Sequence, residues 1–455
     1  MARTKKVRQE GDRLTDLMNI GVLTTRFPLE LVREVLRETG RESQRERALP
    51  AHVLMYYVIA LGLFRPQDTR EVLRVLQEGL QVIYGGRREV RTAGKAAISQ
   101  ARSRLGAAPL QQLYARVAQP VATEQTQGAF YRDWRVVALD GFTLEVPDTE
   151  ANRAAFARPE SPSGGEAAYP RLRGVGLVEV GTHVLFGVAL DSYEVGEITL
   201  ARKAVAHLRP GMLCLADRYF PGYALWEQAT ATGAQLVWRV REKIRFPVEE
   251  QLSDGSYLSR FYAKWNRGRP QGEGIPVRVL EYEVLGSEER VRLVTSVLDE
   301  QVAPAGELAA LYHERWEFET ALDEFKTHLR GARTVLRSQT PELVKQEVYG
   351  LLLAHFALRG LMHEAALQAG RDPDRISFTH TVNVVRRTLP RFAALPPSGL
   401  AQGPPGGGKG DPGGQRRETT APRRQTRRQA QTEPVSGPTA NGSVPNRGSA
   451  GASDS

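Results

Sequence analysis

Two short apolar runs that each end in an aspartate constrain the fold of this chain more than any other feature. Residues 134–139 form one run and lead into Asp140, and residues 212–216 form the second and lead into Asp217. Both lie in a stretch where strand patterns alternate with helical patterns, which is typical of an α/β sheet. In such a sheet the strand ends present their side chains at one edge. The two aspartates are therefore predicted to lie side by side.

Other elements follow from the same periodicities. A long strand is predicted over residues 174–190, helices over about 196–208 and 221–233, and a further strand over 236–240. Residues 245–298 are rich in β patterns and interrupt the alternation, so they are predicted to be an insertion. Helices are then predicted over 304–330, over about 341–368 and over 379–389.

Residues 1–130 have a different pattern, in which apolar residues recur at helical spacing and strand-like alternation is nearly absent. They predict a helical N-terminal domain, and residues 131–390 predict the α/β domain. Within the first domain, residues 92–106 are small and basic. Two interpretations are open here: a helix-turn-helix-like contact with DNA phosphates through Lys95, Arg102 and Arg104, or an ordinary solvated helix.

Composition narrows the environment and the partners. The 455-residue chain can bury a core without disulfides, and its one cysteine, Cys214, offers neither a disulfide nor a thiolate metal site. We find no signal segment or membrane span, so a reducing cytoplasm and no membrane partner are expected. The net charge of +10 favours an anionic partner. Residues 396–455 are rich in Gly, Pro and Arg and predict a disordered tail.

The paired aspartates suggest metal chemistry. Two carboxylates held close together repel each other unless a cation lies between them, and hard oxygen ligands suit Mg²⁺ or Mn²⁺. Two such ions can activate an attacking oxygen and stabilise a leaving oxygen in phosphoryl transfer. A structural alternative is open at this point: Asp140 with Gly141 can form a turn, and Asp217 can cap a helix.

A third motif favours the metal interpretation. Tyr312, Arg315, Glu319 and Lys326 are spaced by three, four and seven residues, which places them on one face of the predicted helix. That face carries a carboxylate between two cations and a phenol. An ordinary amphipathic helix with surface ion pairs is the alternative for any single pair of them, and it accounts less well for a polar stripe that follows a β insertion and two strand-end aspartates.

The same residues carry a resemblance to a known family. The pattern Tyr-x2-Arg-x3-Glu-x6-Lys is the signature of the insertion-sequence-four (IS4) transposases, and residues 312–326 match it at every spacing. Together with Asp140 and Asp217, the three acidic positions of that family are filled. Residues 23–32 and 44–50 also resemble the N-terminal domain of the family, so the similarity covers roughly residues 15–390.

The resemblance implies a ribonuclease H-like catalytic core with a β-rich insertion between Asp217 and Glu319. It implies that these two residues and Asp140 ligate two Mg²⁺ or Mn²⁺ ions. It also implies that Tyr312, Arg315 and Lys326 hold phosphates at a transposon end, and that the protein acts as a homodimer in a synaptic complex. Some relatives stack a flipped base on an aromatic side chain. Trp265 and Trp238 are candidates for that role, and packing is the alternative for each.

The expected activity is metal-dependent cleavage of double-stranded DNA at transposon ends, followed by transfer of the freed 3′-hydroxyl into target DNA. A ribonuclease H-like nuclease without strand transfer and an inactive, transposase-derived DNA-binding protein are the alternatives. Residues 396–455 depart from the family, whose members end in a folded helical segment. This tail suggests either a degraded copy or a DNA-binding arm built on arginine pairs such as Arg416 and Arg417.

Overall fold

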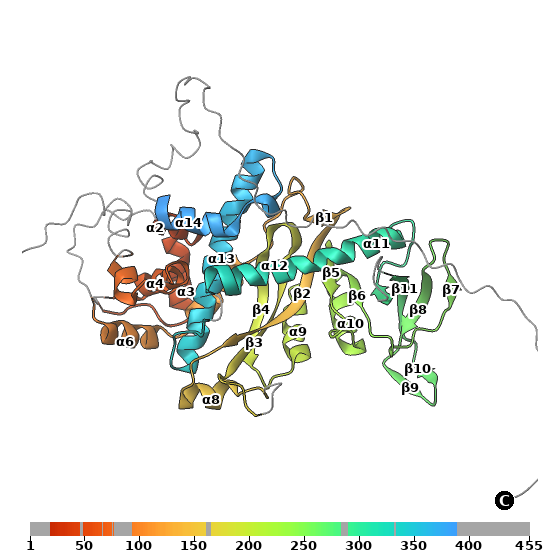
Figure 1. The fold of residues 1–455 in the computed structure, drawn as a ribbon, viewed down its shortest axis with the longest axis horizontal. Coiled ribbons are helices and arrows are strands. Elements are labelled where there is room, and N and C mark those ends of the chain that lie inside the picture. Colours follow the sequence, from red (N-terminus) through yellow and green to blue (C-terminus); the bar gives the residue numbers. More distant parts are fainter. Residues whose placement is uncertain are drawn as a thin grey trace, which may run out of the picture.

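The computed structural model describes residues 19–45, 49–65, 67–74, 76, 93–160, 165–283, 290–331 and 334–388 (Figure 1). The predicted tail, residues 396–455, lies outside the described residues. Within the described part, no helix is long and apolar enough to cross a membrane.

One large mixed sheet of ten strands organises the described part of the molecule, in the order β4-β3-β2-β5-β6-β12-β11-β8-β7, with β1 paired to β2. The strands of its first half are β1 (Phe130–Tyr131), β2 (Trp134–Glu145), β3 (Arg171–Glu179), β4 (Val184–Ser192), β5 (Met212–Ala216) and β6 (Gln235–Arg239). β2, β3 and β4 are antiparallel neighbours, whereas β2, β5 and β6 run parallel. This is the ribonuclease H-like arrangement that the family resemblance implied.

Two details of the predicted strands are wrong. β2 does not end at Asp140 but continues to Glu145, because β3 pairs with it along its whole second half. The predicted long strand over 174–190 is a hairpin of β3 and β4, joined by the 3-10 turn η1 (Val180–Thr182). Gly181 at the centre of that turn has φ +63°, a conformation that suits glycine and reverses the chain.

The two faces of the sheet are covered by different helices. In β2, Val136 and Ala138 join one hydrophobic cluster, and Val137 and Leu139 join the other, as the two-residue period of a strand requires. α9 (Glu197–Val205) and α10 (Tyr223–Thr230) belong to the second cluster. The C-terminal helices belong to the first. Asp140 shares its face with Val136 and Ala138 and is therefore directed toward these C-terminal helices.

The β-rich insertion continues the same sheet. β12 (Arg290–Thr295) pairs antiparallel with β6 and covers the edge that the core sheet would otherwise expose. Beyond it lie β11 (Ile275–Glu283), β8 (Tyr257–Phe261) and β7 (Glu250–Gln251). β9 (Lys264–Asn266) and β10 (Arg269–Gln271) form a separate hairpin at the far end of the insertion (Figure 1).

The stretch predicted as one helix over 304–330 is continuous but not uniform. It consists of α11 (Ala305–Tyr312), the 3-10 turn η2 (His313–Arg315), α12 (Trp316–Asp323) and the π-helical segment η3 (Glu324–Leu329). This helix runs across the sheet in Figure 1. It is followed by α13 (Pro341–Ala369), η4 (Pro373–Arg375) and α14 (Phe378–Thr388). Short π-helical segments are rare and often occur at functional sites.

The N-terminal helices pack against α13. They are α2 (Asn19–Arg26), α3 (Leu29–Glu38), α4 (Ala51–Leu63), α6 (Lys95–Leu105) and α7 (Ala108–Val117). α4 and α13 approach closely at two glycines: a Cβ on Gly350 would lie 2.7 Å from the carbonyl oxygen of Val58, and a Cβ on Gly62 would lie 3.1 Å from Cβ of Ala354. The helical N-terminal part therefore shares one hydrophobic core with the C-terminal helices.

Candidate active site

Arg315 joins two of the three predicted acidic residues. Its Nη1 atom lies 3.0 Å from Oδ2 of Asp140 on β2, and its Nη2 atom lies 3.6 Å from Oε1 of Glu319, one turn further along the helix. Arg315 is buried, whereas the side chain of Glu319 is 48% exposed. The guanidinium thus holds a strand carboxylate and a helix carboxylate at one place, with Glu319 open to solvent.

Asp217 reaches the same place from the end of β5. Although β2 continues past Asp140, β5 ends at Ala216, which pairs with Leu139, so Asp140 and Asp217 stand at the same level of the sheet. The hydroxyl of Tyr312 is 3.4 Å from the carbonyl oxygen of Ala216. Oδ1 of Asp217 accepts a 2.6 Å hydrogen bond from the backbone N–H of Tyr219. This bond closes a local turn and fixes the orientation of the Asp217 carboxylate.

Burial is the main influence on the pKa of Asp140. Burial raises the pKa of Asp140 to about 6, and the nearby charges of Asp217 and Glu197 act in the same direction. The backbone N–H of Gly141, at 2.7 Å, and the Arg315 guanidinium oppose this shift. Burial makes the ionised form of Asp140 unfavourable, and a cation bound beside it would offset that cost.

Lys326 and Tyr312 complete the predicted group. Burial lowers the pKa of Lys326, and the charge of Arg330 adds to that, while Asp140, Asp323 and Glu319 oppose it. Burial raises the pKa of Tyr312 to about 12. All six residues predicted for this site, Asp140, Asp217, Tyr312, Arg315, Glu319 and Lys326, therefore belong to one electrostatic neighbourhood.

Sequence reasoning missed one carboxylate here. Glu197 is the first residue of α9, on the opposite face of the sheet from α12. Its side chain lies against Gly141: a Cβ on that glycine would overlap Oε1 of Glu197 and lie 2.9 Å from its Cδ. Burial raises the pKa of Glu197, and the charge of Asp217 contributes. No motif marks this residue, because an acidic first turn is ordinary in a helix.

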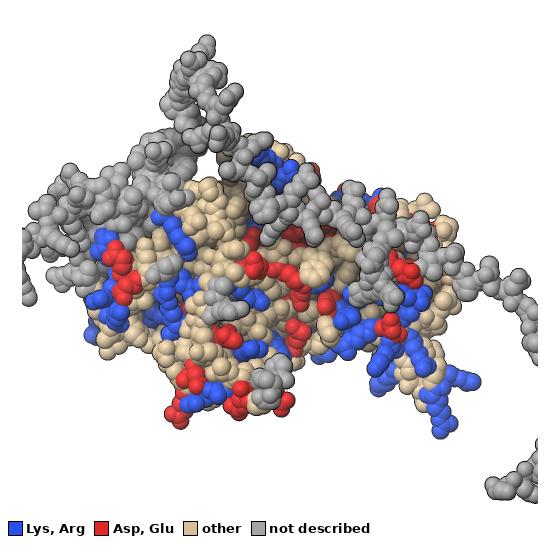
Figure 2. Space-filling view, viewed as in Figure 1, with Lys and Arg blue, Asp and Glu red and all other residues tan. Residues whose placement is uncertain are grey.

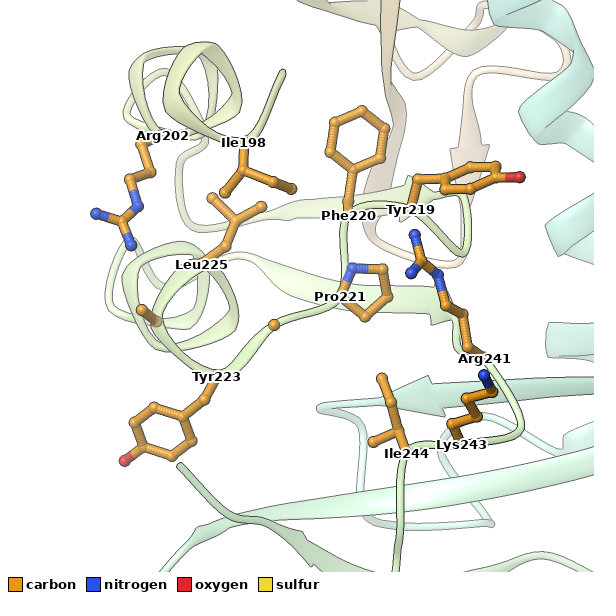
Figure 3. A pocket seen from close by; sticks show the side chains of 12 residues that line it. Ile198, Arg202, Tyr219, Phe220, Pro221, Tyr223, Leu225, Arg241, Lys243 and Ile244 are labelled. Carbon is orange, nitrogen blue, oxygen red and sulfur yellow. The ribbon is translucent and has the colours of Figure 1, made fainter. Parts of the chain in front are cut away.

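An open depression adjoins Asp217. Figure 3 shows its lining, which comes from the start of α9, the turn after β5, the start of α10 and the segment after β6. Its volume is about 530 Å³. Tyr219 is 55% exposed beside it, and the guanidinium carbon of Arg241 lies 4.8 Å from the centre of the Tyr219 ring. An exposed aromatic ring with a cation over it suits stacking or phosphate contacts.

The three basic residues predicted on the N-terminal helices have different surroundings. The guanidinium of Arg102 donates to Oε1 of Gln346 at 2.8 Å and to Oγ of Ser338 at 3.2 Å, so it connects α6 to the start of α13. Lys95 and Arg104 are exposed, and Lys95 forms an ion pair with Asp68 at 2.9 Å. Of the three, only Lys95 and Arg104 are exposed to solvent.

The two tryptophans considered for base stacking also differ. Trp238 is fully buried on β6, with its ring centroid 5.1 Å from that of Trp226, so it is a packing residue. Trp265 lies in the β9–β10 hairpin, is half-buried, and packs edge-on against Tyr262 at 5.7 Å.

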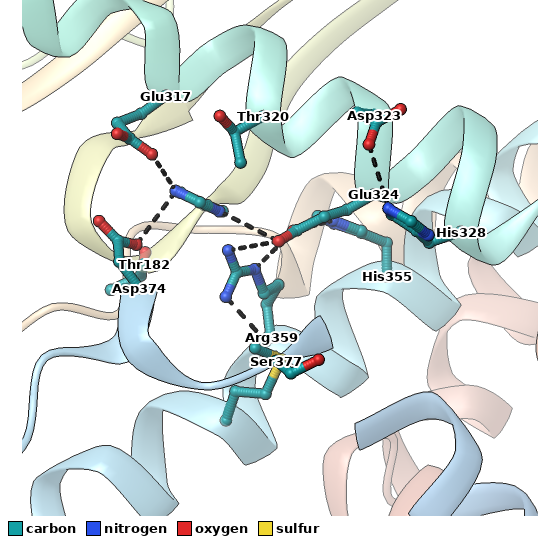
Figure 4. A network of polar contacts seen from close by, with 12 residues as sticks. Thr182, Glu317, Thr320, Asp323, Glu324, His328, His355, Arg359, Asp374 and Ser377 are labelled. Atoms are coloured by element: carbon teal, nitrogen blue, oxygen red, sulfur yellow. Dashed lines mark hydrogen bonds and ion pairs between the residues drawn. The ribbon is translucent and has the colours of Figure 1, made fainter. Parts of the chain in front are cut away.

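A buried charged network holds the other side of the α12–η3 helix (Figure 4). Glu317 and Glu324 point away from the site and toward His183, which lies between η1 and β4. Nε2 of His183 is 2.7 Å from Oε2 of Glu317, and Nδ1 is 3.4 Å from Oε1 of Glu324. Arg359 of α13 pairs with both oxygens of Glu324 at 2.9 and 3.0 Å. The helix that carries Glu319 is thus tied to the sheet and to α13.

Asp374 of η4 closes this network, with Oδ1 at 3.1 Å from Nε2 of His183. Burial alone would lower the pKa of His183, but hydrogen bonds to Asp374 and Glu317 and the charge of Glu324 raise the pKa to about 10. Ligand atoms of His183, Glu317 and Asp374 lie within 4.8 Å of one another, as metal ligands can. A protonated imidazole already satisfies these carboxylates, so we assign the network a structural role.

The raised pKa of His183 predicts a pH-dependent stability. Since this pKa is higher in the folded state than the ordinary value of 6.5, the contribution of His183 is complete below about pH 6.5 and is lost as pH rises through about 10. Between these values the loss is at most about 1.4 kcal/mol per pH unit. We expect the difference in unfolding free energy between wild type and His183→Gln to shrink over this window. A constant difference from pH 6 to pH 10 would contradict a charged His183.

Comparison with known proteins places this fold and site in a class. Residues 17–115 match the family model for the insertion element 4 transposase N-terminal region, and residues 132–357 match the transposase DDE domain. The protein is therefore a DDE transposase, an enzyme that depends on divalent metal and catalyses DNA cleavage and strand transfer. Within that class, the chain belongs to the IS4 family.

A named relative agrees with this family. The chain is 28% identical over 377 residues to the transposase InsG for insertion sequence element IS4 of Escherichia coli K12, covering 82% of this chain and 84% of InsG. Among solved structures, the cryo-EM structure of a piggyBac transposase synaptic complex with hairpin DNA aligns with a TM-score of 0.44 and 12% identity, over 84% of this chain and 83% of that chain.

Proposed function

We propose that Asp140, Asp217 and Glu319 bind two Mg²⁺ or Mn²⁺ ions and that this site cuts and joins DNA. The observation that carries the proposal is that β2, the end of β5 and α12 bring these three residues to one region of the sheet, with Arg315 contacting Asp140 and Glu319. Oxygen donors around a partly open position suit hard divalent cations. Such ions would activate the attacking oxygen and stabilise the leaving oxygen.

The side chains around these carboxylates would position DNA. Arg315 already neutralises Asp140 from the buried side and leaves Glu319 exposed for a ligand. Lys326 carries a charge that burial makes costly, so a phosphate close to it would be stabilised. We propose that Arg315, Lys326 and Tyr312 hold a phosphate group of the transposon end beside the metal-binding carboxylates.

A second surface suits DNA at the far end of the insertion. Figure 2 shows Lys and Arg gathered over the β9–β10 hairpin. Its exposed cations, with those of the segment after β6, are Arg241, Lys243, Arg245, Lys264, Arg267 and Arg269. Within the described residues, none of them forms an ion pair with a carboxylate. Unpaired cations on a projecting hairpin are available to displace counterions from DNA phosphates.

Neutralising this hairpin is expected to weaken DNA binding. The double variant Arg267→Gln and Arg269→Gln should bind terminal-repeat DNA less tightly. The slope of its log binding constant against log salt concentration should be shallower than that of wild type by the amount that corresponds to the loss of up to about two phosphate contacts. The double variant Arg371→Gln and Arg375→Gln removes two exposed charges beside η4 and serves as the control. Fluorescence anisotropy at several salt concentrations measures both. Equal weakening by the two double variants would exclude a specific role for the hairpin.

The activity is tested on the full chain with DNA that carries the terminal repeats of its own element. We expect nicks at the element boundary and joined products on a target plasmid, both in Mg²⁺ or Mn²⁺ and neither in a chelator. Cleavage without joined products would favour a nuclease, and binding without cleavage would favour an inactive, transposase-derived protein.

We further propose that the chain acts in the cytoplasm as a homodimer. Crosslinking of the protein on DNA with paired transposon ends tests the homodimer.

A further inference from the structure

The starting observation is an exposed aromatic ring that is fixed beside Asp217. The backbone N–H of Tyr219 donates to Oδ1 of Asp217 at 2.6 Å, and the N–H of Phe220 donates to the carbonyl oxygen of Asp217 at 3.2 Å. Phe220 is 1% exposed and belongs to the second hydrophobic cluster, so it anchors this turn, whereas Tyr219 is 55% exposed. The turn that orients the Asp217 carboxylate therefore also presents a tyrosine ring to solvent.

Two guanidinium groups lie close to this ring. The guanidinium carbons of Arg241 and Arg218 are 4.8 and 5.5 Å from the centre of the Tyr219 ring. Nε of Arg241 also donates to the carbonyl oxygen of Arg218 at 3.2 Å, which ties the segment after β6 to the turn after β5. Because more than half of Tyr219 is still exposed, the ring can accept a planar group, and the cations favour one that carries negative charge.

The depression beside the ring has a lining that suits the same kind of ligand. Figure 3 shows Ile198 and Leu225 within it, with Arg202 on one side and Arg241 and Lys243 on the other. No Asp or Glu is among its lining residues, and within the described part of the chain none of these three cations forms an ion pair. Apolar side chains between unpaired cations suit a nucleotide, which has an apolar base face and anionic phosphates.

The position of the depression indicates which DNA strand it meets. Arg315 and Lys326, proposed above for the transposon end, lie on the helix that packs on the face of the first hydrophobic cluster. The depression is lined by the starts of α9 and α10, which pack on the opposite face. In strand transfer the 3′-hydroxyl of the transposon end attacks a target phosphate, and the 3′-oxygen of the target strand leaves from the opposite side of the phosphorus. The two strands therefore approach the site from different sides.

We infer that the depression beside Tyr219 binds a nucleotide of the target strand next to the attacked phosphate. Its base stacks on Tyr219, and its phosphates contact Arg202, Arg241 and Lys243. This inference rests on the proposed function, to which it adds a separate site for target DNA. Every base has a π face, so a stacking contact tolerates many sequences and lets the enzyme use many target positions.

The first test uses the full chain, transposon-end DNA that is already cleaved, and a target plasmid. The rate of joining is measured while the target concentration is varied. Tyr219→Leu removes the ring but keeps the backbone N–H that donates to Asp217, and it should raise the target concentration for half-maximal joining by at least about fivefold. Tyr219→Phe keeps the ring and should restore tight target binding. Tyr169→Leu is the matched control, because Tyr169 is an exposed tyrosine outside the lining.

The cations of the depression are tested in the same assay. Arg202→Gln should also raise the target concentration for half-maximal joining. The dependence of joining on salt should become shallower by the amount that corresponds to about one phosphate contact. Lys203→Gln is the control, because Lys203 follows Arg202 in α9 but lies outside the lining and pairs with Asp191. Melting curves establish that each variant is folded.

A binding measurement identifies the strand without catalysis. A synthetic DNA that mimics the joined product carries 2-aminopurine next to the junction, either on the target side or on the transposon side. Wild type should change the emission of the target-side probe, and Tyr219→Leu should remove most of that change. The emission of the transposon-side probe should not depend on the ring.

The outcomes separate this inference from the proposed function. If wild type joins ends to target and Tyr219→Leu needs no more target than wild type does, the enzyme assignment stands and the target site is excluded. A ring-dependent signal from the transposon-side probe alone would assign the depression to the transposon end and overturn the inference. If wild type joins no ends at all, the proposed function is overturned and the target site with it.

Discussion

Replacing Glu319 with glutamine is expected to abolish DNA cleavage and strand transfer while leaving DNA binding almost unchanged. The substitution keeps the shape of the side chain and removes its charge at a half-exposed position of α12. Metal stabilisation of the transition state contributes several kcal/mol, so the rate should fall by at least about 10³-fold. Single-turnover cleavage of terminal-repeat DNA measures the rate, and anisotropy measures the binding.

Asp323→Asn provides the control for Glu319→Gln. Asp323 is exposed on the same helix and pairs with His328 at 3.1 Å, outside the carboxylate cluster. Its rate should stay within about fivefold of wild type, because a surface ion pair contributes about 1 kcal/mol or less and each 1.36 kcal/mol changes a rate about tenfold. Equal rates for wild type and Glu319→Gln would remove Glu319 from the catalytic site.

The second large effect is expected on stability, from the buried network behind the same helix. Arg359 is 1% exposed and pairs with Glu324, whose side chain is 10% exposed. Removing one partner of a buried ion pair leaves the other charge uncompensated and costs about 3 to 5 kcal/mol. Arg359→Met should therefore lower the unfolding free energy by that amount, as chemical denaturation of the full chain measures.

Two further variants test whether the pair is the cause. Lys203→Gln breaks an exposed ion pair with Asp191, and its cost should be below about 1 kcal/mol. The double variant Arg359→Met and Glu324→Gln removes both charges and should be more stable than the sum of the single effects implies. Strict additivity would mean that Arg359 stabilises the fold by packing alone.

Much of the fold was predictable because hydrophobic periodicity reports directly on burial. The apolar run over residues 212–216 became β5, and Asp217 follows its end as predicted. The hairpin of β3 and β4 was not predictable in this way. Its turn, Val180–Thr182, is buried, and only Gly181, Thr182 and His183 separate the apolar residues on either side. A buried turn looks like a strand when only hydrophobicity is considered.

The candidate site was predictable to the extent that its residues lie close in sequence or at strand ends. Tyr312, Arg315 and Glu319 share a helical face, which spacing alone indicates. Glu197 was not predictable, because its relation to Gly141 exists only after α9 has packed on the sheet. The same holds for His183, which lies far from Glu317 in sequence and meets it through the β3–β4 hairpin. Both are tertiary contacts without a local signature.

The close packing of α4 against α13 has a consequence for biosynthesis. Ten of the thirteen residues of α4 are buried, on all sides of the helix, so it has no polar face to offer water. Its partner, α13, is complete only after about 300 further residues have been made, which takes on the order of 15 to 60 seconds. During that interval the surface of α4 that packs against α13 is exposed and apolar. We expect the nascent chain to depend on chaperones until α13 is complete.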